Sequence, residues 1–138
     1  MIILDTSGLL AAIDASQRSH DRALAALRAA SPPWILSPFV LAELDYLLAT
    51  RVGQAAERSL LAEVGRGVYR MEVFEADDVA AAERVIGRYP ALDIGLADAS
   101  LVVFAHRYGI RDVLILDERH FRVLRGPGGR PFRLLPAD

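Results

Sequence analysis

The amino-acid sequence predicts an α/β fold, a three-layer α/β/α sandwich with a short, mostly parallel central sheet. Short apolar runs typical of buried strands alternate with longer segments typical of helices, and this alternation favours a parallel sheet covered by helices. The chain has 138 residues and 53% hydrophobic content, which suits one core and argues against disorder. We therefore expect residues 1–138 to form a single domain.

The N-terminal segment is expected to contain a strand, two helices and a second strand. Ile2–Leu4 is a short apolar run that predicts a buried strand, followed by a turn and a helix that begins over Leu9–Ile13. A second helix is expected over about Ser19–Ala30, because Ser19 is a good N-terminal cap and the proline pair after Ser31 ends it. Trp34–Leu36 predicts the second strand.

Two more helices and a weaker strand are expected in the middle of the chain. Ser37 followed by Pro38 is a typical helix start, and this helix is expected to run as far as Gly53. Gln54–Gly65 predicts the next helix, and Tyr69–Phe74 has a weaker apolar pattern that favours a strand.

The next segment predicts two helices separated by a proline. Asp77–Arg88 is expected to be helical and to stop before Pro90. Asp93 is expected to cap the following helix, Ile94–Tyr108, which ends at Gly109.

Two further strands are expected near the C-terminus. Val113–Leu116 predicts a buried strand, and Phe132–Leu135 predicts a strand at the edge of the sheet. The glycine-rich turn at 126–129 is too short and too late in the chain to divide it into domains.

The overall charge does not by itself indicate a nucleic-acid partner. The net charge is −2, and all 16 basic residues are arginine. From Arg107 onward there are seven arginines against four acids. Arginine pairs with phosphate in a bidentate way, so these arginines could contact phosphate. Alternatively, their number could simply reflect a GC-rich genome.

The composition also disfavours several kinds of protein. The chain has no cysteine, which excludes disulfide frameworks and thiolate metal sites. No apolar run approaches the roughly 18 residues of a membrane span, and no basic segment precedes the first strand-like run. We therefore expect a cytoplasmic protein with no membrane association.

Four carboxylates lie next to or within apolar segments, where an ordinary solvent-exposed position does not explain them: Asp5, Glu43, Asp98 and Asp117. Asp5 and Asp117 each directly follow an apolar strand-like run. They therefore lie at the carboxyl ends of strands, where parallel sheets bind ligands. At about 100° per residue, Glu43 borders the buried face of its helix while Asp45 points elsewhere. The same arithmetic directs Asp98 toward the core or a cleft beside it.

Acids that converge in this way would repel one another unless they take up protons or bind cations. Mg²⁺ and Mn²⁺ prefer oxygen ligands and need only one or two direct carboxylates together with waters. A divalent cation neutralises charge on a phosphate during in-line displacement. The four acids therefore predict metal-assisted phosphodiester hydrolysis.

Each acid has a simpler interpretation. Asp5 could simply cap the helix that follows it, and Asp117 could simply be part of a turn. Glu43 could pair with a buried arginine. Asp98 is harder to explain in this way, because its helix is apolar almost all round. The conjunction of the four carries the hypothesis.

Four other polar residues could support the acids. Thr6 and Ser7 could hydrogen-bond a neighbouring carboxylate or a water of the metal, or only complete the turn. For Asp93 the favoured role is the helix cap. His120 could contact phosphate, but a lone histidine in a turn is more often solvated or structural.

The residues around the four acids resemble the motifs of PIN-domain nucleases. The first motif is Met1-Ile-Ile-Leu-Asp5-Thr-Ser-Gly-Leu-Leu and the second is Leu41-Ala-Glu43-Leu-Asp-Tyr-Leu-Leu. The third is Asp93-Ile-Gly-Leu-Ala-Asp98-Ala-Ser-Leu-Val, and the fourth is Leu114-Ile-Leu-Asp117-Glu-Arg-His-Phe121. Their order, their spacing and the chain length resemble VapC, the toxin of VapBC toxin–antitoxin systems.

The resemblance implies a single PIN-like domain and a Mg²⁺- or Mn²⁺-dependent endoribonuclease that cleaves single-stranded or structured RNA. By motif position, Asp5 and Asp98 would be the principal metal ligands. Glu43 and Asp117 would complete the acidic site. The resemblance also implies a homodimer and a cognate antitoxin that covers the site.

Two other functions remain open from the residues alone. One is a non-catalytic module of the same fold that binds RNA or protein. The other is a phosphatase of the haloacid-dehalogenase type with Asp5 as nucleophile, although that chemistry wants a second aspartate where this chain has Ser7.

Overall fold

The computed structural model describes residues 1–138 and contains one sheet of five strands, all parallel, in the order β3-β2-β1-β4-β5. The strands are β1 (Ile2–Leu4), β2 (Trp34–Leu36), β3 (Arg70–Met71), β4 (Asp112–Leu114) and β5 (Arg133–Leu135). The predicted α/β class with a short parallel sheet is confirmed. Phe132–Leu135 was correctly predicted as an edge strand, since β5 pairs only with β4.

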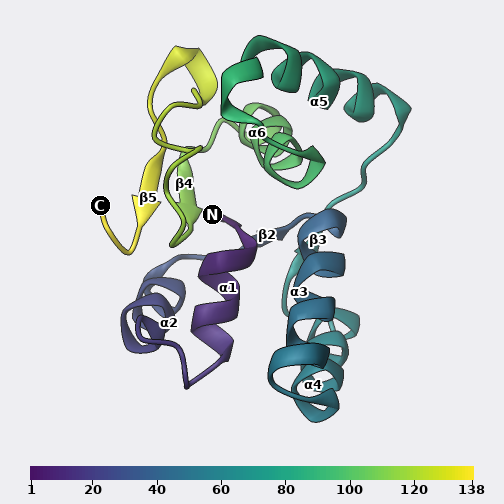
Figure 1. Cartoon of the computed structure of the whole chain (residues 1–138), viewed down its shortest axis with the longest axis vertical. Coiled ribbons are helices and arrows are strands. Elements are labelled where there is room, and N and C mark those ends of the chain that lie inside the picture. The colour runs from purple at the N-terminus through teal and green to yellow at the C-terminus, as the bar shows by residue number, and fades with distance from the viewer.

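Six α-helices connect the strands: α1 (Thr6–Ile13), α2 (His20–Ala29), α3 (Pro38–Arg51), α4 (Gln54–Gly65), α5 (Ala76–Arg88) and α6 (Leu96–Tyr108). From β1 to β3 the chain moves steadily toward one edge of the sheet, and it then returns past β1 to β4. Because parallel crossovers are right-handed, this reversal places α1–α4 on one face and α5–α6 on the other. Figure 1 shows this division, with α5 and α6 above the strands and α1 to α4 below them.

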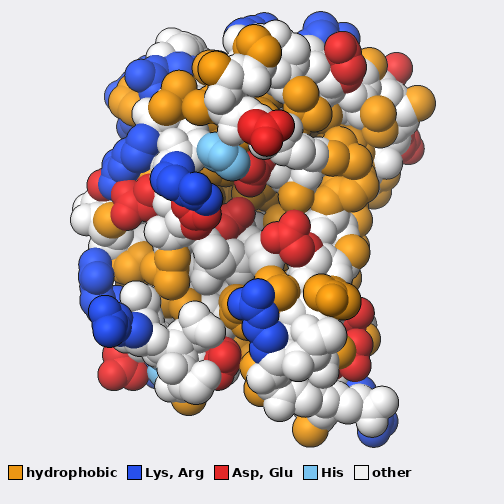
Figure 2. All heavy atoms as spheres, in the orientation of Figure 1, with side chains coloured by type: hydrophobic (Ala, Val, Ile, Leu, Met, Phe, Trp, Pro, Cys, Tyr) orange, Lys and Arg blue, Asp and Glu red, His pale blue; other side chains and the backbone are white.

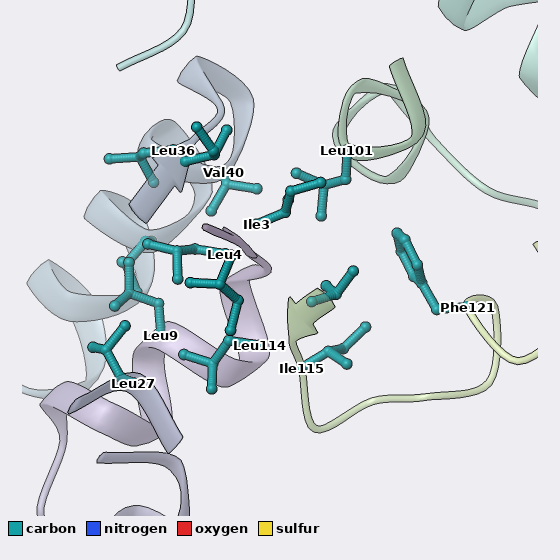
Figure 3. Close-up of a cluster of buried hydrophobic side chains, with 14 of the residues drawn as sticks. Ile3, Leu4, Leu9, Leu27, Leu36, Val40, Leu101, Leu114, Ile115 and Phe121 are labelled. Atoms are coloured by element: carbon teal, nitrogen blue, oxygen red, sulfur yellow. The ribbon is translucent and has the colours of Figure 1, made fainter. Parts of the chain in front are cut away.

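The core lies on both faces of the central strand β1. Ile3 points toward Leu101 of α6, whereas Leu4 points toward Leu9 of α1 (Figure 3). These side chains are fully buried, and they belong to a cluster of 28 buried residues that joins the sheet to helices on both sides. Strands buried on both faces explain why β1 is apolar at every position.

Helix α1 and strand β4 are among the elements whose bounds differ from the sequence prediction. Helix α1 begins at Thr6, three residues earlier than expected, because Asp5 caps it and accepts a hydrogen bond from the Ser7 backbone N–H. Strand β4 ends at Leu114 rather than Leu116. The backbone N–H groups of Leu116 and Asp117 donate to the Ser7 hydroxyl instead of to a strand, at 2.9 and 3.2 Å.

Strand β3 is shorter than the predicted Tyr69–Phe74. The chain turns out of the sheet at Glu72, whose side chain is buried and accepts hydrogen bonds from Tyr108 Oη at 2.8 Å and Arg107 Nη1 at 2.9 Å. Arg107 also pairs with Asp78 of α5. These contacts connect the segment that follows β3 to α6 and to the start of α5.

The prediction that Asp93 caps the sixth helix is wrong. Asp93 has φ 54° and ψ 40°, a left-handed conformation that ends the short turn Pro90–Leu92. A helix cap needs an extended backbone, and Gly95 supplies it with φ −105° and ψ −170°. Aspartate is among the few residues that tolerate the left-handed region.

None of the helices combines the length and the apolar character that crossing a lipid bilayer requires.

Candidate active site

A cavity of about 630 Å³ lies beyond the carboxyl ends of β1 and β4. These two strands are neighbours, and the chain leaves them in opposite directions along the sheet. Such a topological switch point is where open α/β sheets bind ligands. All four acids that the sequence singled out line this cavity: Asp5, Glu43, Asp98 and Asp117. Figure 2 shows acidic side chains gathered around the hollowed middle of one face, with basic side chains at its margins.

Asp5 lies at the centre of this arrangement, between β1 and α1. Its Oδ2 accepts from the Ser7 backbone N–H at 2.9 Å and from the Ser7 hydroxyl at 2.5 Å. The pKa of Asp5 is raised to about 6, chiefly by burial. The negative charges of Asp98 and Glu43 add to this rise, and the hydrogen bonds from Ser7 oppose it. Asp5 is therefore both the helix cap and a carboxylate that favours a proton or a cation.

Ser7 joins the first acidic segment to the fourth. Its hydroxyl donates to Asp5 and accepts from the backbone N–H groups of Leu116 and Asp117. One side chain therefore fixes the orientation of Asp5 and the path of the chain that carries Asp117. The predicted hydrogen bond of Ser7 to a neighbouring carboxylate is confirmed.

Replacing Ser7 with alanine is expected to lower the free energy of unfolding by about 1–3 kcal/mol, because two N–H groups lose their acceptor and Asp5 loses a donor. Ser16→Ala is a matched control. Ser16 makes the same paired contact with Asp14, at 3.0 and 2.8 Å, but it is exposed and contacts no other segment. Urea denaturation of both variants checks this prediction, and equal losses would contradict it.

Glu43 lines the cavity from α3, and Asp45 on the same helix does not. Val40, Leu44 and Leu48 form the buried stripe of α3, and Glu43 lies at its border. Asp45 faces α4, where its interaction with Glu57 raises the pKa of Glu57. The helical arithmetic separated these two acids correctly, although Glu43 is more exposed than an acid within the apolar face would be.

Asp98 stands in the first turn of α6, where the helix N-terminus favours negative charge. Its side chain is 23% exposed, and its Oδ2 lies 2.8 Å from Nδ1 of His120. The helix presents Leu101, Val102 and Ala105 to the core, as predicted, and Asp98 to the cavity.

Asp117 is held differently from the other acids. Both of its oxygens pair with Arg119, Oδ1 with Nε at 2.9 Å and Oδ2 with Nη2 at 2.8 Å. The hydrogen bond from Arg119 lowers the pKa of Asp117. Both side chains are more than half exposed, and an exposed pair of this kind contributes only about 0–1 kcal/mol, so Asp117 can leave Arg119 at little cost.

The remaining candidates divide clearly. Thr6 is buried and lines the cavity together with Ser7, whereas Asp93 does not line it. His120 and Arg51 also line the cavity. The sequence favoured a solvated or structural role for His120 and did not single out Arg51. Arg51 could have been found from spacing, since it lies two steps of four residues beyond Glu43 on the same side of α3.

The C-terminal arginines are mostly engaged within the chain. Six of the seven make side-chain contacts: Arg107, Arg111, Arg119, Arg122, Arg125 and Arg133. Arg122, for example, pairs with Glu118 and with both carboxylate oxygens of Asp138. These contacts give the arginine-rich tail an internal structural role.

The donor set of the cavity fits a hard divalent cation. Carboxylates from three helices or helix starts and one loop supply only oxygen atoms. No three acidic or histidine side chains form a ready-made ligand group. That arrangement suits Mg²⁺ or Mn²⁺, which keep several waters and take one or two carboxylates directly, and Asp5 and Asp98 are the residues that could hold the ion.

The raised pKa of Asp5 predicts how the stability of the metal-free protein depends on pH. The folded pKa, about 6, lies above the ordinary value of 3.8, so the folded state binds more protons in this window. Stability should therefore fall as the pH rises from about 4 to about 6, by at most roughly 3 kcal/mol. Asp5→Asn should lack this decrease, because asparagine does not titrate in this range. The variant should still fold, since asparagine can also cap α1. Thermal melting of both proteins between pH 4 and pH 7.5 measures the difference, and parallel curves would contradict it.

An α/β/α sandwich with acids around its switch point is the arrangement of a class of metal-dependent nucleases, and the sequence comparison agrees with it. The PIN domain family model matches residues 2–126, and the chain belongs to that family. PIN-domain ribonucleases are generally metal-dependent.

Within the family, the predicted resemblance to VapC is confirmed. Ribonuclease VapC26 of Mycobacterium tuberculosis is 42% identical over 135 residues, which cover 98% of this chain and all of VapC26. The crystal structure of M. tuberculosis VapC20, a toxin that cleaves the sarcin–ricin loop, matches with a TM-score of 0.79 and 26% identity over 85% of this chain and 90% of VapC20.

A more distant structure shares the fold. VapBC2 of Rickettsia felis, bound to a DNA fragment from its promoter, matches with a TM-score of 0.67 and 19% identity. The match covers 97% of this chain and 98% of the other.

Proposed function

We propose that this protein is a Mg²⁺- or Mn²⁺-dependent endoribonuclease and the toxin of a toxin–antitoxin pair. The observation that carries the proposal is the convergence of Asp5, Glu43, Asp98 and Asp117 on one cavity at the switch point of the sheet. The 42% identity to a VapC ribonuclease over nearly the whole chain supports RNA as the substrate.

The acids divide the work according to their surroundings. Asp5 and Asp98 bind the cation, since Asp5 is the acid whose burial most favours a counter-charge and Asp98 lies close enough to affect its pKa. A bound divalent cation supplies charge neutralisation at the phosphate and lowers the pKa of water. Glu43, which is exposed at the cavity wall, and Asp117, once it leaves Arg119, orient the attacking water.

The partners follow from the same similarity. We expect a cognate antitoxin that covers the acidic cavity, and we expect the protein to act in the cytoplasm, where its RNA substrates lie. A homodimer is also expected. Exposed apolar side chains, including Tyr46 at 67% and Val73 at 65% exposure, are available for protein contacts.

Incubation of the purified protein with total RNA and Mn²⁺, followed by sequencing of the new 5′ ends, tests the proposal. We expect a small set of cut sites that disappear with EDTA and with the Asp5→Asn variant. RNA that is bound but uncut would instead favour the non-catalytic binding module, and phosphate trapped on Asp5 would favour the phosphatase.

A further inference from the structure

We propose that His120 is a positioning residue of the acidic site: its imidazole holds one oxygen of Asp98 so that the other stays free for the divalent cation. This inference rests on the proposed function, in which Asp98 binds that cation. It assigns a specific role to a histidine for which the sequence allows phosphate contact but favours a solvated or structural position.

The contact joins two separate parts of the chain. His120 lies in the turn after β4, Asp98 lies in the first turn of α6, and 22 residues separate them. Nδ1 of His120 is 2.8 Å from Oδ2 of Asp98, a good hydrogen-bond length. An ionised carboxylate can only accept, so Nδ1 carries the hydrogen, and neutral imidazole is sufficient for this.

The contact leaves one oxygen of Asp98 available. Oδ2 is its only side-chain atom with a hydrogen-bond partner in the chain, and both side chains line the cavity. Carboxylates that bind metals are usually hydrogen-bonded by neighbouring groups that fix their orientation. His120 stands in that position relative to Asp98.

The turn that carries His120 is firmly anchored. The backbone carbonyl of His120 accepts hydrogen bonds from the backbone N–H groups of Val123 and Leu124, both at 3.0 Å. The next residue, Phe121, is 1% exposed and packs edge-on against Phe132 with ring centroids 5.2 Å apart. Figure 3 shows Phe121 within the buried cluster. A ring tied to the core through its neighbour keeps a fixed place, which positioning requires.

The same turn is also clamped from the C-terminus. Arg122 pairs with both carboxylate oxygens of Asp138, at 2.9 and 2.8 Å, and its backbone N–H donates to the Glu118 carbonyl. Asp138 therefore helps to hold the turn that presents His120 to Asp98.

The test is the affinity of the metal-free full-length protein for Mn²⁺ alone, measured by electron paramagnetic resonance. His120→Phe keeps a ring but removes both nitrogens, and we expect it to weaken Mn²⁺ binding by about 10- to 100-fold. His120→Asn retains an N–H group near the Nδ1 position, and we expect it to recover most of the affinity. His106→Phe, on the exposed part of α6, is the matched control and should bind as the wild type does.

RNA cleavage gives a second measure. Because His120 acts through Asp98, a large excess of Mn²⁺ should restore activity to His120→Phe but not to Asp98→Asn. Equal loss of Mn²⁺ affinity in His120→Phe and His120→Asn, in folded protein, would overturn the positioning role. So would wild-type affinity in His120→Phe while Asp98→Asn loses binding. Wild-type Mn²⁺ affinity in Asp98→Asn would instead overturn the proposed metal site itself.

Discussion

Replacing Asp98 with asparagine is expected to abolish metal-dependent RNA cleavage while the fold stays intact. The loss should reach about 10³-fold or more, equivalent to at least about 4 kcal/mol of transition-state stabilisation, because a principal ligand of the cation is removed. The fold should survive, since asparagine has the same shape and the side chain is partly exposed at the start of α6. The helix would lose only about 0.3–1 kcal/mol from the interaction of the charge with its N-terminus.

Asp93→Asn is the matched control for this variant. Asp93 lies five residues earlier in the same motif, is exposed and does not line the cavity. Asparagine tolerates the left-handed backbone found there. Cleavage assays in Mn²⁺ with both variants should therefore show one inactive and one fully active protein. Full metal-dependent activity in Asp98→Asn would refute the assignment of the site.

Replacing Gly8 with alanine is expected to disrupt the fold. A Cβ atom on Gly8 would lie 2.3 Å from the carbonyl oxygen of Leu114 and 2.7 Å from the nitrogen of Ile115. Both are backbone atoms of the segment at the end of β4, and the Leu114 oxygen also accepts from the Asp5 N–H at 3.0 Å. Neither side can move without breaking the contact between β1 and β4, so we expect a loss of about 3 kcal/mol or more in the free energy of unfolding.

Gly87→Ala provides the contrast. Gly87 lies within α5, and the nearest atom to its added Cβ would be Oε1 of Glu83 at 4.0 Å. Alanine favours helix over glycine by about 0.5–1 kcal/mol, so this variant should be slightly more stable than the wild type. Thermal unfolding followed by circular dichroism measures both effects. A melting temperature for Gly8→Ala close to that of the wild type would contradict the tight contact of α1 with β4.

Local signals in the sequence were sufficient for most of the fold. The apolar run Ile2–Leu4, the Ser37-Pro38 helix start and the glycine at 109 each correspond to an element boundary in the structure. The exceptions have tertiary causes. The end of β4 is set by Ser7, which lies more than a hundred residues away. Helix α6 is capped by Gly95 and not by Asp93, whose backbone is left-handed.

The candidate site was predictable to a similar degree. Helix geometry separates Glu43 from Asp45, and the strand-end position identifies Asp5. The strand order that makes β1 and β4 neighbours could not be derived from the sequence, and without it the convergence of Asp5 and Asp117 remained a hypothesis. The contact between His120 and Asp98 could not be predicted from the sequence either, because it depends on how an irregular turn packs against α6.

The chemistry of the new RNA ends tests the central claim most directly. If the acids and a divalent cation activate water to attack the phosphate, wild-type protein in Mn²⁺ should leave a 5′-phosphate on one product and a 3′-hydroxyl on the other. Ligation-based sequencing with and without phosphatase treatment distinguishes these ends. Products that carry a 2′,3′-cyclic phosphate and a 5′-hydroxyl would mean that the RNA attacks itself, and they would contradict hydrolysis by water at the four carboxylates.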